Sequence, residues 1–507
     1  MIKAHPKKPD WWIVDRESAL KYISGVPGIQ IFDKTAWVHR THLPLFGLRG
    51  RDLIGYNLED IQPFLEPISY LRDYQNKGRR RILSQKGTLL AWQMRTGKTA
   101  VAASSWLGNG RLLVVAPLAV RPVWMQWIKK CHPGAKVAYV TGKKFDPEQI
   151  QGADAIFCHY NIMGQWGSMG IGRDIELLVL DEIHLLSNFS SNRSTGCMLA
   201  STFAKRIVGT TGTPIWNKPA GFFNVLDNIC PGAFGNYWKF TARYTSGQKG
   251  EFGWVTGVPS NTQELQARLT EVMSILTWRD ILGQVPNIQR SVEIADLTYN
   301  QRLELDKLQL VVGPAARSTI EIAEMARMRK LLGDIKADAA VSLAKDFLES
   351  ESVVIWTWHK SVADAIHSKL KNAGFSTFMA TGDDIDITPI LDEWRKSPIS
   401  ALVITIGVGQ VGIDLSKARH CIFAEIDYTP VVISQAAMRT FSPDHPCTET
   451  FILADHEVDR RLVYTILRKC REAFEMGVPA AESELDILRI AYEEDEPDLA
   501  DIVKGLI

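Results

Sequence analysis

The sequence predicts an α/β protein with two lobes, each a parallel β-sheet flanked by helices, joined by a helical bridge. Its 507 residues exceed what one hydrophobic core usually supports, so two domains plus smaller appendages are expected. Short runs rich in Val, Ile and Leu alternate with helix-forming stretches, and these runs fall into two sets along the chain. Only the first set contains a strand, a tight loop and a helix in which Gly97, Lys98 and Thr99 stand where the loop joins the helix.

Composition, charge and cysteine spacing argue against a disordered chain, a metal-binding cysteine cluster and a membrane-spanning protein. Apolar residues make up 46% and charged residues 23% of the chain, as in ordinary globular proteins. The net charge of +1 gives no general affinity for polyanions, so nucleic acid would have to be bound by a local basic strip. The seven cysteines are scattered without metal-site spacing, and no apolar run reaches the roughly 18 residues of a membrane span. We therefore expect a soluble, cytoplasmic protein with no membrane partner. The short loops favour a bacterial or virus-infected host cytoplasm.

Residues 1–66 are expected to form a small N-terminal α+β accessory module. Gly and Pro punctuate short apolar pieces in this region, which is typical of short strands and turns. The aromatic side chains either fill a small core or, if exposed, stack on nucleic-acid bases; they are Trp11, Trp12, Phe32, Trp37 and Phe46. No motif assigns this module a role.

Residues 67–285 are expected to form the first lobe. Its strands are predicted from apolar runs at 88–90, 111–117, 155–158, 177–180 and 206–208, with helical stretches between them. Continuous apolar runs are typical of strands that helices cover on both faces. The lobe is therefore predicted to be a doubly wound parallel sheet.

The first of these strands leads into a candidate phosphate-binding loop. Backbone N–H groups at the start of the following helix can bind an anion, Lys98 can place a charge on the β- and γ-phosphates, and the Thr99 hydroxyl can ligate Mg²⁺. The strict phosphate-loop pattern asks for glycine where Trp92 stands, so an ordinary strand-to-helix turn is the alternative. The residues predicted to bind nucleotide here are Arg95, Thr96, Gly97, Lys98 and Thr99.

Three more side chains are expected near this loop. Asp181 and Glu182 directly follow the strand at 177–180, at the edge where such sheets bind ligands. Asp181 can hold Mg²⁺, and Glu182 can orient and deprotonate the attacking water, although an acidic pair alone is usually a helix cap. The amide of Gln75 offers the donor and the acceptor that an adenine edge requires. The predicted cofactors are therefore ATP and Mg²⁺.

Residues 286–345 are expected to form a helical linker, and residues 346–472 the second lobe. Strands of this lobe are predicted at 353–357, 376–379, 401–404, 420–423 and 448–453. It has no Gly-Lys-Thr loop, so Gln435 and Arg439 are predicted to reach a nucleotide held by the first lobe and to couple lobe closure to hydrolysis. Residues 473–507 are rich in Asp and Glu, with Leu and Ile between them, and are expected to form a helical acidic tail.

Taken together, these elements resemble the ATPase motor of helicase superfamily 2, in its Swi/Snf-type branch of double-stranded DNA translocases. The resemblance covers about residues 68–470, and the segment 238–285 is similar to the annealing-helicase and fork-remodelling group. It implies two RecA-like lobes that track along duplex DNA without necessarily separating its strands. The motifs fall in the family's order at residues 71–75, 91–99, 116–129, 160, 181–194, 211–217, 353–359, 407–416 and 435–439.

Two positions depart from the family pattern. Arg95 stands where this branch has glycine, and a side chain there could narrow the backbone's approach to the phosphates. In the last motif Arg439 matches the first arginine, whereas Ser442 replaces the second. Either Arg439 stabilises the transition-state charge, a nearby basic group substitutes, or hydrolysis is slow. The resemblance assigns catalysis to Lys98, Asp181, Glu182 and Arg439.

In this family DNA crosses both lobes and is held mainly through its phosphates, which position the polymer without reading its sequence. Each candidate contact taken alone is more often a solvated surface residue. The expected DNA-binding residues are Arg121, Trp124, Lys129, Lys130, Asn161, His359, Lys360, Gln410 and Lys417.

The resemblance implies an ATP-dependent translocase that remodels double-stranded DNA, branched or partly unwound, in replication, recombination or repair. Two alternatives stay open: a strand-separating DNA or RNA helicase, and a nearly inert ATP-gated clamp or regulatory subunit. The sequence identifies no protein partner.

Overall fold

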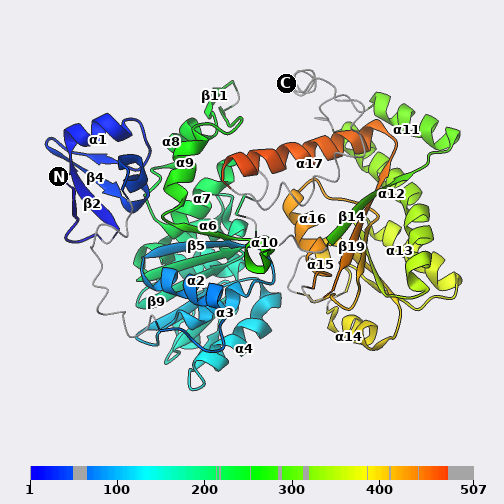
Figure 1. Ribbon diagram of the computed structural model, residues 1–507, viewed down its shortest axis with the longest axis horizontal. Helices are drawn as coiled ribbons and strands as arrows, with labels where there is room; N and C mark the ends of the chain where they lie inside the picture. Colours follow the sequence, from blue (N-terminus) through cyan, green and yellow to red (C-terminus); the bar gives the residue numbers. More distant parts are fainter. Residues whose placement is uncertain are drawn as a thin grey trace. The chain divides into compact units, whose positions relative to one another are not determined.

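The computed structural model divides the chain into two compact units. Unit 1 comprises Met1–Gln284 with Glu472–Ala480, and unit 2 comprises Val285–Arg471 with Ala481–Ile507. Every helix within the described part of the chain is too short or too polar to cross a membrane. The structure describes residues 2–8, 10–48, 66–212, 214–215, 219–251, 253–283, 288–311, 319–384, 386–409, 413–442 and 445–477 (Figure 1).

Unit 1 begins with a small module, blue in Figure 1, whose antiparallel sheet has the order β1-β2-β4-β3. Alternate residues of β2 face its core, so Trp12 and Val14 are buried against Ile23 of the helix. Asp15 caps that helix, because its carboxylate accepts from the Ser18 backbone N–H at 2.7 Å. The elements are β1 (Ile2–Ala4), β2 (Trp11–Asp15), α1 (Arg16–Ile23), β3 (Gln30–Ile31), β4 (Thr35–His39) and the 3₁₀ helix η1 (Arg40–Phe46).

The module packs directly on the rest of unit 1. The fully buried guanidinium of Arg268 donates to the Tyr244 hydroxyl (2.8 Å), the Ala233 carbonyl (2.7 Å) and Thr41 of the module (3.2 Å). At Gly28 a Cβ atom would lie 1.9 Å from the Ala233 carbonyl oxygen, so only glycine permits this approach. The module and the lobe therefore share one buried polar network.

The main sheet of unit 1 has seven parallel strands in the order β13-β5-β10-β9-β6-β8-β7. The five predicted strands of the first lobe are confirmed. The two that were not predicted lie at the sheet edges, where they are short and partly exposed, so they lack a fully buried apolar run. The strands are β5 (Gly87–Trp92), β6 (Arg111–Val115), β7 (Val137–Tyr139), β8 (Ala155–Cys158), β9 (Ile175–Asp181), β10 (Arg206–Thr211) and β13 (Met273–Leu276).

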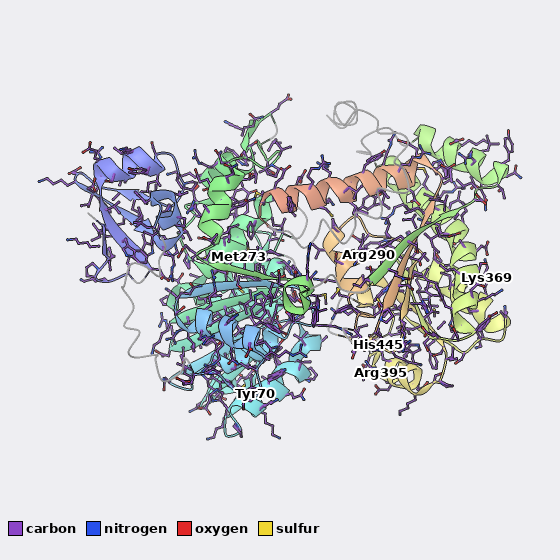
Figure 2. All side chains as sticks on the ribbon, viewed as in Figure 1. Tyr70, Met273, Arg290, Lys369, Arg395 and His445 are labelled. Atoms are coloured by element: carbon purple, nitrogen blue, oxygen red, sulfur yellow. The ribbon has the colours of Figure 1, made fainter. Side chains whose placement is uncertain are left out.

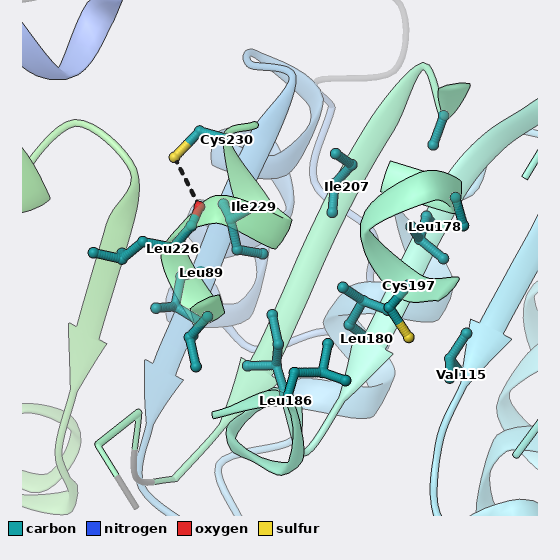
Figure 3. Packing of buried hydrophobic residues seen from close by; sticks show 14 of the residues in the cluster. Leu89, Val115, Leu178, Leu180, Leu186, Cys197, Ile207, Leu226, Ile229 and Cys230 are labelled. Atoms are coloured by element: carbon teal, nitrogen blue, oxygen red, sulfur yellow. Dashed lines mark hydrogen bonds between the residues drawn. The ribbon is translucent and has the colours of Figure 1, made fainter. Parts of the chain in front are cut away.

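Helices cover both faces of this sheet. Leu178 and Leu180 of β9 pack with Leu226 and Ile229 in one cluster, which Figure 3 shows from close by. The alternate residues Leu177 and Val179 belong to the cluster on the other face. Because both faces are buried, the strands read as continuous apolar runs. The helices of the lobe are α2 (Asp73–Leu83), α3 (Lys98–Ser104), α4 (Arg121–Cys131), α5 (Met163–Ser168), α6 (Asn192–Phe203), α7 (Phe222–Ile229), α8 (Tyr237–Tyr244), α9 (Thr262–Leu269) and α10 (Trp278–Leu282).

Unit 2 contains a six-stranded parallel sheet in the order β14-β19-β18-β15-β17-β16. The five strands predicted for the second lobe are confirmed, as β15 (Val353–Thr357), β16 (Thr377–Ala380), β17 (Ala401–Thr405), β18 (His420–Phe423) and β19 (Cys447–Ala454). Its helices are α11 (Tyr299–Val311), α12 (Thr319–Leu348), α13 (Lys360–Asn372), α14 (Thr388–Lys396), α15 (Ile406–Gly409), α16 (Pro430–Ala437) and α17 (Glu457–Glu475).

The range expected to be a helical linker also contains the strand β14 (Ile288–Ala295). Arg290 of β14, labelled in Figure 2, donates to the buried Glu449 of β19 at 2.7 Å. Polar and apolar residues alternate along β14 because it is a half-exposed edge strand, and this pattern lacks the continuous apolar run of the central strands.

The range expected to be an acidic tail begins inside α17. Its first residues belong to unit 1, where Ala473 and Met476 are buried and the Glu475 carbonyl accepts from Gln266 at 2.8 Å. Residues 478–507, which carry the acidic stretch, lie outside the described residues.

Candidate active site

The loop between β5 and α3 has the backbone of an anion-binding turn. Arg95 and Gly97 have positive φ values of 63° and 83°, and α3 begins at Lys98. At this φ a side chain on Gly97 would be strained, and its Cβ atom would also displace the Gln75 amide, which would lie 2.2 Å away, so the position favours glycine. The left-handed Arg95 occupies a conformation that glycine adopts without strain, which gives a physical reason for the family's preference at that position.

Side chains from two helices brace this loop. The carbonyl of Thr96 accepts hydrogen bonds from the Gln75 amide and the Tyr74 hydroxyl of α2, both at 3.0 Å. From α10, the Trp278 indole donates to the Met94 carbonyl at 3.0 Å. The loop is thus held from both sides before any ligand binds, which reduces the entropy lost on binding.

The ammonium group of Lys98 lies across the start of the loop. Its Nζ atom donates to the carbonyls of Trp92 and Gln93 at 2.9 and 3.1 Å. Trp92, which stands where the strict pattern has glycine, buries its indole against Gly78 of α2 and donates to Ser274 of β13 at 3.0 Å. The bulky side chain therefore fills the core beside the sheet, which explains why this departure from the pattern is tolerated.

Asp181 ends β9 at the same edge of the sheet. Its Oδ1 atom accepts from the Thr210 hydroxyl (2.6 Å) and the Glu182 backbone N–H (3.1 Å), and Oδ2 accepts from the Trp124 indole (2.7 Å). Burial and then the Glu182 charge raise the pKa of Asp181, while these hydrogen bonds and the nearby Lys98 oppose that rise. The parallel register pairs Asp181 with Thr210, and Thr211 with Ala91, so the ends of three strands meet here.

Glu182 turns the chain away from the sheet, with a left-handed φ of 51°. Its Oε2 atom lies 3.3 Å from Nδ1 of the buried His184, and the same nitrogen lies 2.9 Å from the Thr211 hydroxyl. Burial lowers the pKa of His184 to about 3, so the imidazole is neutral at pH 7 and its contact with Glu182 is not an ion pair. Two hydrogen bonds link this turn to the end of β10, one between Asp181 and Thr210 and one between His184 and Thr211.

The residues at this edge fit a magnesium nucleotide. Mg²⁺ bound with a nucleotide takes one or two protein oxygen ligands and completes its shell with phosphate and water. Thr99, on the first turn of α3, and Asp181 offer such oxygens. Among the described residues no group of three or more His, Cys, Asp or Glu side chains forms a separate metal site.

In unit 2, Gln435 lies on α16 and Arg439 follows that helix, and both side chains are mostly buried. The Arg439 carbonyl accepts from the Leu415 backbone N–H at 3.0 Å, which joins the last motif to the residues before β18. Ser442 forms a β-bridge with His445, labelled in Figure 2.

The structure corrects the DNA-binding predictions at two positions. Trp124 is fully buried and donates to Asp181, so its indole reaches the acidic pair instead of the surface. The ammonium group of Lys417 donates to the Trp394 and Ser397 carbonyls and to the Ser400 hydroxyl, which leaves it no position for a DNA phosphate.

Other predicted contacts differ in how exposed they are. On α4 the exposed guanidinium of Arg121 lies over the Tyr139 ring at 4.3 Å. His359 is about three-quarters buried and forms a 2.6 Å contact with Glu425, while the exposed Lys360 lies 3.4 Å from two carboxylates. Lys129, Lys130 and Asn161 are also exposed, and Gln410 lies outside the described residues.

Sequence reasoning missed the roles of Thr210, Tyr74 and Trp278. Trp278 belongs to the segment that resembles the fork-remodelling group, so a signal was present without an assigned role. Tyr74 lies within the motif at 71–75 and Thr210 directly precedes the one at 211–217, but their hydrogen bonds join residues far apart in the sequence.

Two family models match this chain. The model of the SNF2-related domain matches residues 15–360, and the model of the helicase conserved C-terminal domain matches residues 336–443. Two solved structures are similar: the Sulfolobus solfataricus SWI2/SNF2 ATPase core in complex with dsDNA (TM-score 0.39, 18% identity, 84% of this chain, 96% of that chain) and the Pyrococcus furiosus Hef helicase domain (TM-score 0.48, 15% identity, 78% of this chain, 98% of that chain).

Curated proteins that are similar to this chain are longer than it is. It is 26% identical over 390 residues to the SWI/SNF-related matrix-associated actin-dependent regulator of chromatin subfamily A-like protein 1 of Xenopus tropicalis, which covers 73% of this chain and 41% of that protein. It is 24% identical over 378 residues to the DNA annealing helicase and endonuclease ZRANB3 of Bos taurus, which covers 69% of this chain and 35% of that protein. The chain thus spans less than half the length of either relative.

Proposed function

Because this chain belongs to the SNF2-related domain family, we propose that it is an ATP-dependent double-stranded DNA translocase that remodels branched or partly unwound DNA by branch migration or annealing. The observation that carries the proposal is that Lys98, Asp181 and Glu182 follow β5 and β9 at one sheet edge, with only β10 between these strands. The name of one relative, an annealing helicase, supports DNA as the polymer. Replication, recombination or repair is the corresponding setting.

In this proposal the side chains of unit 1 bind and cleave ATP. Lys98 compensates the charge of the β- and γ-phosphates, and Gln75, whose amide already contacts the loop, reads the adenine. Thr99 and Asp181 would hold Mg²⁺, which neutralises charge that develops on the phosphates. Glu182 orients the attacking water and accepts its proton.

Unit 2 supplies the remaining groups. Gln435 and Arg439 would approach the nucleotide when the lobes close, and Arg439 would stabilise charge on the transferred phosphoryl group. The proposal divides the chain into a module (1–66), two lobes (67–285 and 346–472), a linker (286–345) and a tail (473–507).

The DNA surface in this proposal uses the exposed candidates. Phosphate contacts by exposed cations position DNA without reading its sequence, so binding would be salt-sensitive and nearly sequence-independent. The members of this set that the structure describes are Arg121, Lys129, Lys130, Asn161 and Lys360.

Steady-state ATPase measurements with no DNA and with double-stranded, single-stranded and branched DNA test the proposal. Stimulation by double-stranded or branched DNA over single-stranded DNA is expected. If none of these DNAs changes the ATPase rate, the protein is not a DNA-driven motor. That result would favour an ATP-gated clamp or regulatory subunit, an alternative suggested by Ser442, which stands in place of a second arginine.

A strand-displacement assay on a forked duplex separates the remaining alternative. Remodelling without release of a single strand is expected, because the resemblance is to translocases that keep the duplex paired. Release of one strand from a simple fork would instead indicate a strand-separating helicase.

A further inference from the structure

Unit 1 has a pocket of about 300 Å³ where the N-terminal module meets the lobe. Lys7, Lys8 and Trp11 of the module line one side, and Lys86 and Cys230 of the lobe line the other. This volume is at the lower end of the range for small-molecule sites. The pocket is therefore large enough for a small organic ligand.

The pocket has an excess of positive charge. Its lining contains three lysines and one carboxylate, that of Asp10, which already lies 3.4 Å from the Arg40 guanidinium and accepts from the Lys86 backbone N–H at 3.1 Å. Within the described residues, none of the three ammonium groups has a carboxylate within 4 Å or donates a hydrogen bond.

Two of these ammonium groups are held by their surroundings. Lys8 lies over the rings of Trp11 (5.4 Å) and Trp37 (4.7 Å), which restricts where its charge can point. Lys86 is half-buried, and burial lowers its pKa, which means that its charged form lacks full compensation in the free protein. An anion in the pocket would supply that compensation.

This pocket is separate from the candidate active site. Lys86 and Gly87 stand at the beginning of β5, whereas the phosphate loop follows the end of the same strand. A six-residue strand spans roughly 17 Å between its first and last residues, so the two sites lie at opposite ends of β5.

We propose that this pocket binds a small organic phosphate of the nucleoside-monophosphate class, either free or at the 5′ end of a DNA strand. The three ammonium groups match the two negative charges of a phosphate monoester, and the partly exposed Pro231 offers apolar surface for the rest of the ligand. The side chains of Gln30 and Thr202 line the pocket and offer hydrogen bonds to a polar ring edge. The proposal does not depend on the protein being a motor.

Equilibrium dialysis of the full-length protein with radiolabelled deoxyadenosine 5′-monophosphate tests the site. Lys86→Ala is expected to weaken binding at least about tenfold, as for a lost hydrogen bond to a charged group. Lys205→Ala is the matched control, because Lys205 is exposed and precedes β10 at the same sheet edge without lining the pocket. Lys98→Ala reports any nucleotide bound at the phosphate loop, and the binding that survives in this variant and depends on Lys86 belongs to the pocket.

The proposal would be overturned if Lys205→Ala weakened nucleotide binding as much as Lys86→Ala does. It would also be overturned if Lys98→Ala weakened binding and Lys86→Ala did not. If Lys86→Ala fails to fold, the exposed Lys7→Ala serves as the second pocket variant, and unchanged binding there would overturn it equally.

Competition by short single-stranded oligonucleotides identifies the source of the phosphate. A 5′-phosphorylated strand that displaces the nucleotide, while its 5′-hydroxyl counterpart does not, supports the strand end as the ligand. No displacement by either strand supports the free nucleotide. Equal displacement by both strands would contradict recognition of a phosphate monoester.

Discussion

Trp124 donates a hydrogen bond to Asp181, so replacing Trp124 should change how ATP hydrolysis depends on pH. In the proposed function Asp181 must be ionised to hold Mg²⁺, so activity would be present above its pKa and lost as the pH falls through it. Burial already raises that pKa, whereas the Trp124 N–H, 2.7 Å from Oδ2, favours the ionised form. Trp124→Phe keeps an aromatic ring in the core and removes this donor, so the pKa of Asp181 should rise further.

The size of the effect follows from one charge-assisted hydrogen bond. Such a bond contributes about 1.5–3 kcal/mol, and 1.36 kcal/mol corresponds to one pH unit. Thr210 and the Glu182 backbone N–H still donate to Asp181 in the variant, so we expect the lower end of this range. The acidic limb of the kcat profile should move upward by about one pH unit, with little change on the alkaline side.

The control for this variant is Trp166→Phe. Trp166 is also fully buried in unit 1, but its indole donates to the Gly142 carbonyl at 3.0 Å, away from the acidic pair. Stopped assays of Mg²⁺-dependent ATP hydrolysis between pH 5 and 9 compare the two variants. The reasoning is refuted if Trp124→Phe leaves the acidic limb in place, or if both variants move it equally.

Three further results are expected. Lys98→Ala should lower kcat for ATP hydrolysis at least ~10²-fold and change DNA affinity, measured by gel-shift titration, by no more than about a factor of two. Equal loss of hydrolysis and of DNA affinity would contradict separate sites for ATP and DNA. Arg268→Met should destabilise unit 1 by about 3 kcal/mol, because buried acceptors lose their donor, whereas Arg173→Met, at an exposed position of unit 1, should cost about 0.5 kcal/mol or less. Urea unfolding followed by tryptophan fluorescence separates them. Lys129→Ala should reduce the slope of log affinity for duplex DNA against log salt by about one, and Lys34→Ala, on the module, should leave the slope unchanged.

The sequence predicted the central strands well because their physical cause is local. Helices cover both faces of β9, so every residue of that strand is buried and the apolar run is continuous. The edge strands β7, β13 and β14 are short or half-exposed, and their pairing depends on neighbours far along the chain. No local pattern reports such pairing.

The same distinction applies to the candidate site. Gly97, Lys98 and Thr99 could be selected because one short loop requires those residue types in that order. Trp124 was assigned to DNA because it belongs to a motif that lines the DNA surface in the resembled family, and a motif match does not say which of its side chains are buried. Its actual partner, Asp181, is 57 residues away, and only the fold brings the two side chains together.

The network around Arg268 determines how this protein can be dissected in the laboratory. A fragment that starts after residue 66 would lose Thr41 as an acceptor and would expose the surface that Gly28 covers on Ala233. Inactivity of such a truncated motor would therefore report a damaged lobe, and could not be read as proof that the first residues recognise a substrate. Point substitutions on the outer face of the module, such as Lys34→Ala, are the cleaner way to ask what it does.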